Sequence, residues 1–130
     1  MKVLYSPIGT VFICNDKVYY NTDLYTQIQR YKILGELTVL VFPVIVDKPR
    51  GVLKDDDGVT LVFINKVNSL KGLTVGHLKN DRIIREEVKR CDACICHVYT
   101  MHAGQVIKYA RKFNRPLIPQ HFDLTLFISS

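Results

Sequence analysis

Residues 93–118, ACICHVYTMHAGQVIKYARKFNRPLI, carry two successive patterns that predict a strand, a helix and a second strand. The apolar run 93–98 is typical of a strand that is buried on both faces of a sheet. Apolar residues then recur at the 3.6-residue period of one helix face. Pro116 ends this helix, because proline lacks the amide hydrogen that a helix interior requires, and Leu117 begins the second strand. The inner face of the predicted helix consists of Ala103, Val106, Ile107, Ala110 and Phe113.

The rest of the chain repeats this alternation of strands and helices. A short apolar strand is predicted at 1–8, and unbroken apolar runs predict inner strands at 37–42 and 59–67, alongside 93–98. Buried strands that alternate with amphipathic helices predict an α/β fold with a mostly parallel sheet and helices on both of its faces.

Turn and cap residues predict where the other elements begin and end. Asn15-Asp16 separates two short strands and predicts a two-residue hairpin, since both residue types tolerate a positive φ. One further helix is predicted to be capped within Thr22-Asp23 and to end at Gly35. Another is predicted to be capped within Asn80-Asp81.

Length and composition bound the kind of protein. The chain has 130 residues, 48% of them hydrophobic and 23% charged, which indicates one globular domain and excludes a disordered chain. Lys and Arg number 18 and Asp and Glu 12, so the net charge is +6 (18 − 12), which favours anionic partners. Four cysteines are too few for a disulfide scaffold, so we expect a reduced, cytoplasmic compartment. The chain shows neither a signal-peptide core nor an apolar run long enough to span a membrane.

Histidines mark the predicted ends of neighbouring strands. In parallel sheets, ligands bind beyond the carboxyl ends of the strands. His97 ends one predicted strand, His121 follows the next, and His102 begins the helix between them. A single histidine is more often structural, but three histidines at neighbouring strand ends favour a functional site.

Three other motifs have simpler interpretations than the functions they resemble. The Cys91-x-x-Cys94 pair has no second pair to complete a zinc site, and Cys94 and Cys96 fall in a predicted buried strand, so no metal is predicted. Asp55-Asp56-Asp57 contains a D-x-D motif, but three acids before a glycine are more typical of a solvated turn than of a metal site. The loop 6–10 has one glycine and lacks the dinucleotide and P-loop patterns.

Basic residues cluster on the outer faces of the last two predicted helices. Nine Lys or Arg and four Asp or Glu lie between Lys79 and Arg115. A solvated surface explains this excess, and contact with anionic lipid head groups is the functional alternative. Nucleic acid is not expected, because Tyr109 is the only aromatic residue interleaved with these charges. The candidate contacts are Arg82, Arg85, Lys89, Lys108, Arg111, Lys112 and Arg115.

Several of these segments together resemble one protein family. The segments are CDACICH at 91–97, KYARKF at 108–113 and RPLI at 115–118, followed by His121. They resemble the N-terminal, acceptor-side domain of GT-B fold bacterial glycosyltransferases, of the retaining type that builds surface polysaccharides. The resemblance covers residues 1–122 and leaves 123–130 as an atypical tail.

The resemblance implies a single Rossmann-like domain that binds a sugar acceptor, such as a lipid-linked oligosaccharide. It carries His121 and His97 as catalytic candidates, and Gly9 and Thr10 as the positions nearest the sugar donor. The family's second half, which binds the nucleotide sugar, has no counterpart here. We therefore expect the chain to be inactive alone, to meet a nucleotide sugar only with a second domain or subunit, and to hold no cofactor. The alternative is a non-catalytic α/β module that binds a partner protein or an anionic membrane, peripherally on the inner face of the plasma membrane.

Overall fold

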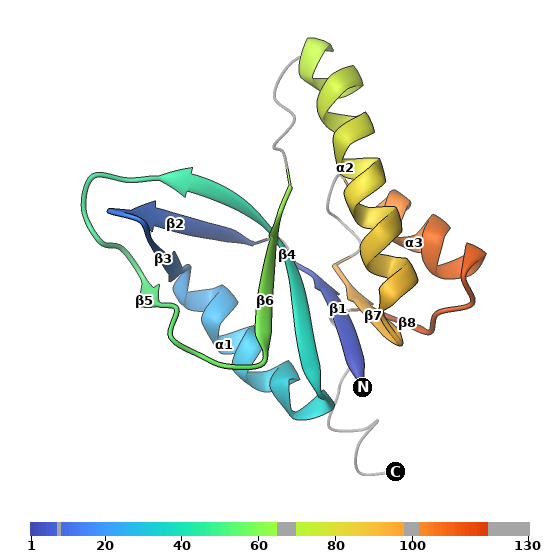
Figure 1. Ribbon diagram of the computed structural model, residues 1–130, viewed down its shortest axis with the longest axis horizontal. Coiled ribbons are helices and arrows are strands. Elements are labelled where there is room, and N and C mark those ends of the chain that lie inside the picture. The colour runs from blue at the N-terminus through green and yellow to red at the C-terminus, as the bar shows by residue number, and fades with distance from the viewer. Residues whose placement is uncertain (8, 65–69, 98–101, 120–130) are drawn as a thin grey trace.

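A computed structural model describes residues 1–7, 9–64, 70–97 and 102–119, with side chains described outside 70–78, and these form a mixed α/β fold (Figure 1). The helices are α1 (Thr22–Tyr31), α2 (Leu70–Arg90) and α3 (Ala103–Lys112), with a 3-10 turn η1 (Lys32–Leu34) after α1. The strands are β1 (Lys2–Ser6), β2 (Thr10–Cys14), β3 (Lys17–Tyr20), β4 (Glu36–Ile45), β5 (Val52–Leu53), β6 (Val59–Phe63), β7 (Ala93–Cys96) and β8 (Leu117–Pro119).

Five of the strands form a parallel sheet in the order β6-β4-β1-β7-β8. β1 lies in the middle, where Val3 pairs with Leu37 of β4 on one side and with Ala93 of β7 on the other. The predicted mostly parallel sheet is therefore confirmed.

The predicted inner position of β6 is wrong. Within the described part of the chain β6 pairs with β4 alone, so it lies at an edge of the sheet. Its apolar run has a different cause, because each face of this edge strand is partly covered. Leu61 packs against the core on one face of the sheet, and Val62 packs against the core on the other.

β4 continues beyond its predicted end at Phe42 and joins the parallel sheet to an antiparallel extension. Its last four residues pair with β2 in parallel, and β3 and β5 then follow as antiparallel neighbours, β3 on β2 and β5 on β3. Pro43 does not stop the strand, since the amides of Phe42 and Val46 on either side of it donate to β2. The proline nitrogen faces the opposite side, beyond the last β4–β6 pair, where no ladder hydrogen bond is lost. The predicted hairpin turn is confirmed, with φ of 49° at Asn15 and 64° at Asp16.

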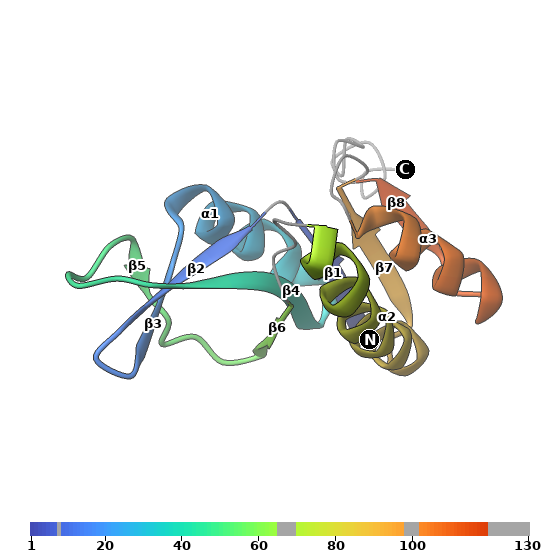
Figure 2. The ribbon, with the colours of Figure 1, turned by 90° about the horizontal axis from the view of Figure 1, so that it is seen from above.

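Helices cover both faces of the sheet, as predicted. On β1, Val3 and Tyr5 pack into the core beneath α1, whereas Leu4 between them packs into the core beneath α2 and α3. Figure 2 shows α1 and α2 on opposite sides of the strands. No helix among the described residues is long and apolar enough to cross a membrane.

Both predicted N-caps are wrong. The cap of α1 is Asn21, whose side chain accepts a 3.0 Å hydrogen bond from the amide of Asp23. α2 does not begin at Asn80-Asp81 but runs through both residues from Leu70. Asn80 is buried inside this helix, and the Asp81 carboxylate instead accepts hydrogen bonds from α3, including one of 2.5 Å from Tyr109. The side chain of Asp81, a residue type that often caps helices, therefore joins the two helices here.

Candidate functional site

The carboxyl ends of β1 and β7 lie side by side at the middle of the parallel sheet. Ser6 pairs with Cys96 as the last step of this ladder, and the amide of His97 donates a 2.8 Å hydrogen bond to the carbonyl of Ser6. The chain runs from β1 toward the β4 side and from β7 toward β8 on the other side. In open α/β sheets, ligands bind where the connections part in this way.

A buried serine–histidine pair stands at this edge. His102, which immediately precedes α3, places Nε2 2.7 Å from the Ser6 hydroxyl oxygen, and both side chains are buried. The rings of His102 and of Phe42 in β4 also meet in an edge-to-face arrangement, with ring centroids 5.7 Å apart. Burial lowers the pKa of His102 to about 4, so its imidazole is uncharged at neutral pH. The hydrogen bond between Ser6 and His102 therefore joins two uncharged groups.

Of the two histidines predicted as catalytic, the described structure includes His97. His97 follows β7 and is half-buried, with its backbone joined to Ser6. His121 lies outside the described residues. The sequence pattern of histidines at strand ends also contained His102, whereas its partner Ser6 carried no signal, because the two lie 96 positions apart.

Gly9 and Thr10 lie at the start of the antiparallel extension. Gly9 is buried, and a Cβ atom there would stand 3.0 Å from Cγ of Pro7 and 3.1 Å from Cδ1 of Leu24. A glycine at this position therefore lets α1 pack closely against the chain. Thr10 is half-buried, opens β2 and pairs with Phe42.

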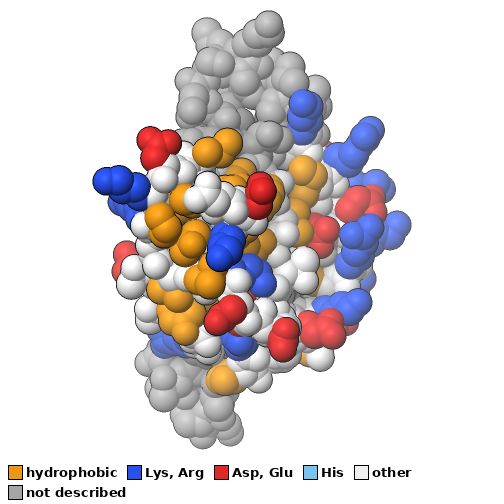
Figure 3. Space-filling model, turned by 60° about the vertical axis from the view of Figure 1, so that its left-hand side comes forward, with side chains coloured by type: hydrophobic (Ala, Val, Ile, Leu, Met, Phe, Trp, Pro, Cys, Tyr) orange, Lys and Arg blue, Asp and Glu red, His pale blue; other side chains and the backbone are white. Residues whose placement is uncertain are grey.

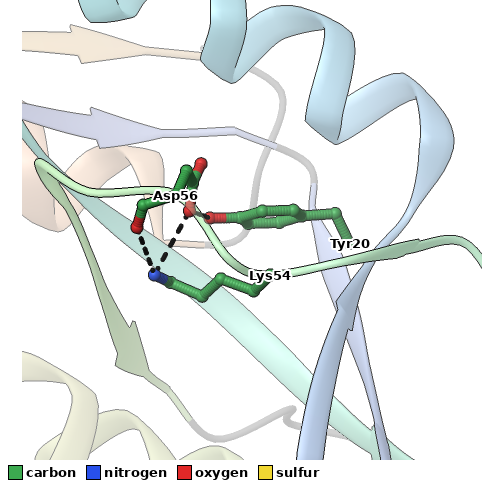
Figure 4. A network of polar contacts seen from close by, with 3 residues as sticks. All are labelled: Tyr20, Lys54 and Asp56. Carbon is green, nitrogen blue, oxygen red and sulfur yellow. Dashed lines mark hydrogen bonds and ion pairs between the residues drawn. The ribbon is translucent and has the colours of Figure 1, made fainter.

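The aspartate run after β5 forms an internal anchor rather than a fully solvated turn (Figure 4). The side chain of Asp56 is only 10% exposed, and its Oδ1 accepts a 2.8 Å hydrogen bond from Tyr20 and contacts Nζ of Lys54 at 3.3 Å. Burial and the bond to Asp56 raise the pKa of Tyr20 well above its usual value, so the phenol remains a donor. Asp55 and Asp57 are exposed, as predicted. Among the described residues, no group of three or more side chains is arranged to hold a metal ion.

The basic residues predicted to contact anions are partly engaged within the protein. α2 and α3 are in contact, and Arg115 donates a 2.9 Å hydrogen bond to the Lys89 carbonyl. Nη1 of Arg85 lies 3.6 Å from Glu86 on the same helix. The exposed members of the set are Arg82, Lys89, Lys108, Arg111 and Lys112.

Large apolar side chains are exposed where β4 and β6 end. Ile45 is 86% exposed, and Val44, Leu53 and Phe63 retain about two-fifths of their surfaces. Figure 3 brings forward the side of the molecule that carries β2, β3 and β5, and hydrophobic side chains gather across the middle of that face.

Comparisons with protein-family models, with curated proteins and with solved structures find no significant match.

Proposed function

We propose that the chain is the acceptor-binding half of a glycosyltransferase of the bacterial surface-polysaccharide type, with a Rossmann-like fold. The observation that carries the proposal is the strand order. Numbered along the chain, the five parallel strands follow the order 3-2-1-4-5, with the first strand in the middle. This is the order of doubly wound sheets, whose ligands bind where it reverses. Here that point lies between β1 and β7.

The residues at this point suit a neutral, hydroxyl-rich ligand. Ser6 and the neutral His102 fix the edge with a buried hydrogen bond, and half-buried His97 lies beside them. An imidazole donates a hydrogen bond through one nitrogen and accepts one through the other, which matches sugar hydroxyl groups. We therefore assign acceptor binding to His97, with Ser6 and His102 as positioning residues.

The nucleotide sugar requires a second domain or subunit in this proposal. Holding a diphosphate calls for a glycine-rich loop or a bound metal, and the described residues supply no metal-binding cluster. The exposed apolar side chains of Val44, Ile45 and Phe63 at the carboxyl ends of β4 and β6 support a covering partner at this edge.

Calorimetry on the isolated chain tests the proposal. The acceptor probe is an uncharged disaccharide linked directly to a short alkyl chain, and the donor probes are common sugar nucleotides. We expect the acceptor probe to bind at least tenfold more tightly than any sugar nucleotide, which should bind no more tightly than about 1 mM, or roughly −4 kcal/mol. Micromolar binding of a sugar nucleotide, or no binding of the acceptor probe, would overturn the proposal.

A matched pair of variants places the binding on His97. His97→Ala should weaken acceptor binding by roughly tenfold, the effect of one lost hydrogen bond. Gln29→Ala, on the exposed surface of α1, should leave it unchanged. Equal affinities of the two variants would remove His97 from the site.

A second candidate function is attachment to an anionic membrane, and the outer face of α3 favours it. Lys108, Arg111 and Lys112 are exposed within one turn of this helix. Nζ of Lys108 lies over the ring of Tyr109, 4.9 Å from its centroid. A lysine can pack its aliphatic chain against the protein in this way while its charge stays at the surface.

Sedimentation with phosphatidylglycerol vesicles separates this candidate from the first. Each cation near such a surface contributes about 1 kcal/mol, so Lys108→Glu with Lys112→Glu should weaken binding at low salt by roughly 30-fold or more. The charge-matched control is Lys17→Glu with Lys48→Glu, at exposed positions in β3 and after β4. Equal loss in both double variants, or equal binding to neutral vesicles, would exclude a specific membrane face.

A further inference from the structure

Two cysteines lie in contact where the end of α2 meets β7. Cys91 directly follows α2 and Cys94 lies in β7, and their sulfur atoms are 3.5 Å apart. We propose that Cys91 and Cys94 are a reversible redox pair that a hydroperoxide converts to a disulfide. This modification is independent of sugar binding, because the pair lies at the amino end of β7 and the candidate site at the carboxyl end.

The other two cysteines have different surroundings. All four cysteines are free and buried. Cys14 ends β2 in the antiparallel extension, and the Cys96 thiol donates to the carbonyl of His97 at 3.7 Å. Cys91 and Cys94 are therefore the pair whose sulfur atoms meet in the described structure, and Cys14 and Cys96 are internal controls.

The surroundings give the two thiols different roles. Cys91 is 6% exposed and Cys94 is fully buried, so a small oxidant reaches Cys91 first. The hydrogen bond from Cys94 and the positive charge of Arg115 lower the pKa of Cys91, against the opposing effect of burial. The bond to Cys91 and burial raise the pKa of Cys94, so Cys94 is the member of the pair that keeps its proton. A thiolate next to an arginine is the reactive form of cysteine.

Arg115 is held beside this pair by the backbone. Its Nη2 donates a 2.9 Å hydrogen bond to the carbonyl of Lys89, two residues before Cys91. Its Nε is buried without a hydrogen-bond partner among the described residues. The positive charge of this guanidinium attracts a thiolate formed at Cys91 and so favours the charged form of the thiol.

The oxidation of the two thiols to a disulfide proceeds in two steps. The Cys91 thiolate attacks one oxygen of hydrogen peroxide, the O–O bond breaks, and hydroxide leaves, which gives a sulfenic acid at Cys91. The sulfur of Cys94 then attacks the sulfenic sulfur, and the hydroxyl group leaves as water with the Cys94 proton. With the released hydroxide protonated by solvent, two thiols lose two electrons and peroxide becomes two molecules of water. A thiol reductant reverses the disulfide by exchange.

Mass spectrometry of the full chain tests the proposal. The reduced protein is treated with stoichiometric hydrogen peroxide, unfolded, and alkylated with N-ethylmaleimide. We expect two of the four thiols to be protected and a linked Cys91–Cys94 peptide that dithiothreitol releases. In the same molecules, Cys91 should oxidise at least tenfold faster than Cys14 and Cys96. Four alkylated thiols after treatment, or Cys91 reacting no faster than Cys14, would overturn the proposal.

Variants assign the two roles. Cys94→Ser should stop at a sulfenic acid on Cys91, which dimedone traps, whereas Cys14→Ser should form the disulfide as the wild type does. Arg115→Gln should slow the oxidation of Cys91 by roughly tenfold, because it removes a positive charge that favours the thiolate. Dimedone labelling spread evenly over the remaining cysteines in Cys94→Ser would contradict the assignment. Circular dichroism checks that each variant is folded, and the internal comparison in the wild type stands independently of any variant.

Discussion

At the scale of single residues, buried polar side chains of this protein bind partners far away in the chain. His102 meets Ser6 across 96 positions, and Tyr20 meets Asp56 across 36. The sequence pattern placed His102 near a strand end, but it could not predict the partner. The contact between Ser6 and His102 exists only after β1 and β7 have paired.

Titration of His102 should make the protein sensitive to acid. Its pKa is lowered from 6.5 to about 4 in the folded protein, so the unfolded chain binds the proton more readily. The stability that His102 contributes is therefore complete above about pH 6.5 and is lost as the pH falls toward 4, by about 3 kcal/mol in total. Urea unfolding between pH 7 and 4.5 measures the free energy of unfolding.

His102→Gln is the comparison that isolates this effect from the titration of carboxylates. Glutamine keeps a hydrogen-bonding group but does not titrate in this range. The free energy of unfolding of the variant should fall less between pH 6.5 and 4.5 than that of the wild type. Parallel curves would contradict the role of His102.

The Tyr20–Asp56 bond should stabilise the fold measurably. Tyr20→Phe removes the donor to a carboxylate that is nine-tenths buried, which should lower the free energy of unfolding by about 2 kcal/mol. Tyr19→Phe, at the half-buried neighbouring position on β3, is the control and should cost less than about 0.5 kcal/mol. Chemical denaturation measures both, and equal losses would show that the bond adds nothing.

At the scale of elements, the apolar runs predicted the strands better than the cap residues predicted the helices. The runs at 37–42 and 93–98 correspond to β4 and β7 because burial on both faces requires continuous apolar sequence. The Asn80-Asp81 pair misled the prediction, since the same polar atoms that cap helices also form contacts between them. Local sequence does not distinguish these two uses.

Two glycines in the connections around β5 should differ sharply in their tolerance of alanine. Gly51 and Gly58 both have positive φ, 88° and 79°. A Cβ atom at Gly51 would stand 2.0 Å from the carbonyl oxygen of Tyr20, whereas at Gly58 nothing lies within 4 Å. Gly58→Ala should cost about 1 kcal/mol from backbone strain alone. Gly51→Ala should cost at least ~2 kcal/mol more, because β3 and β5 must move apart.

Thermal unfolding of the two variants checks this prediction. Each carries the same change of residue at the same kind of backbone conformation, so the difference reports the clash with Tyr20. A loss of stability at Gly58 as large as that at Gly51 would contradict the close packing of β5 on β3.

At the scale of the whole molecule, the mostly parallel sheet and its two helical layers followed from the alternation of strands and helices. The edge position of β6 and the antiparallel extension did not. The sequence of β6 resembles that of an inner strand because side chains on each of its faces pack against a core. β4 continues through Pro43 because the nitrogen of this proline faces away from β2. Strand order is a property of long-range pairing, and periodicity reports only burial.

The candidate site likewise combines features that the sequence predicts with features that depend on long-range strand pairing. His97 could be placed at a strand end from the apolar run before it, and the meeting of the β1 and β7 ends could not be predicted, because it depends on strand order. The paired sulfurs of Cys91 and Cys94 were visible as a spacing, but their contact depends on how α2 ends against β7.

We propose that a sugar acceptor binds at the carboxyl ends of β1 and β7. A titration of the ¹⁵N-labelled chain with the uncharged alkyl disaccharide, followed by amide chemical shifts, locates the bound sugar on the sheet. We expect shifts at Ser6, His97 and His102, and none at Lys2 and Asp92, which are joined by a 2.8 Å hydrogen bond at the opposite, amino ends of the same strands. Shifts confined to the amino ends, or to the outer faces of α2 and α3, would contradict it.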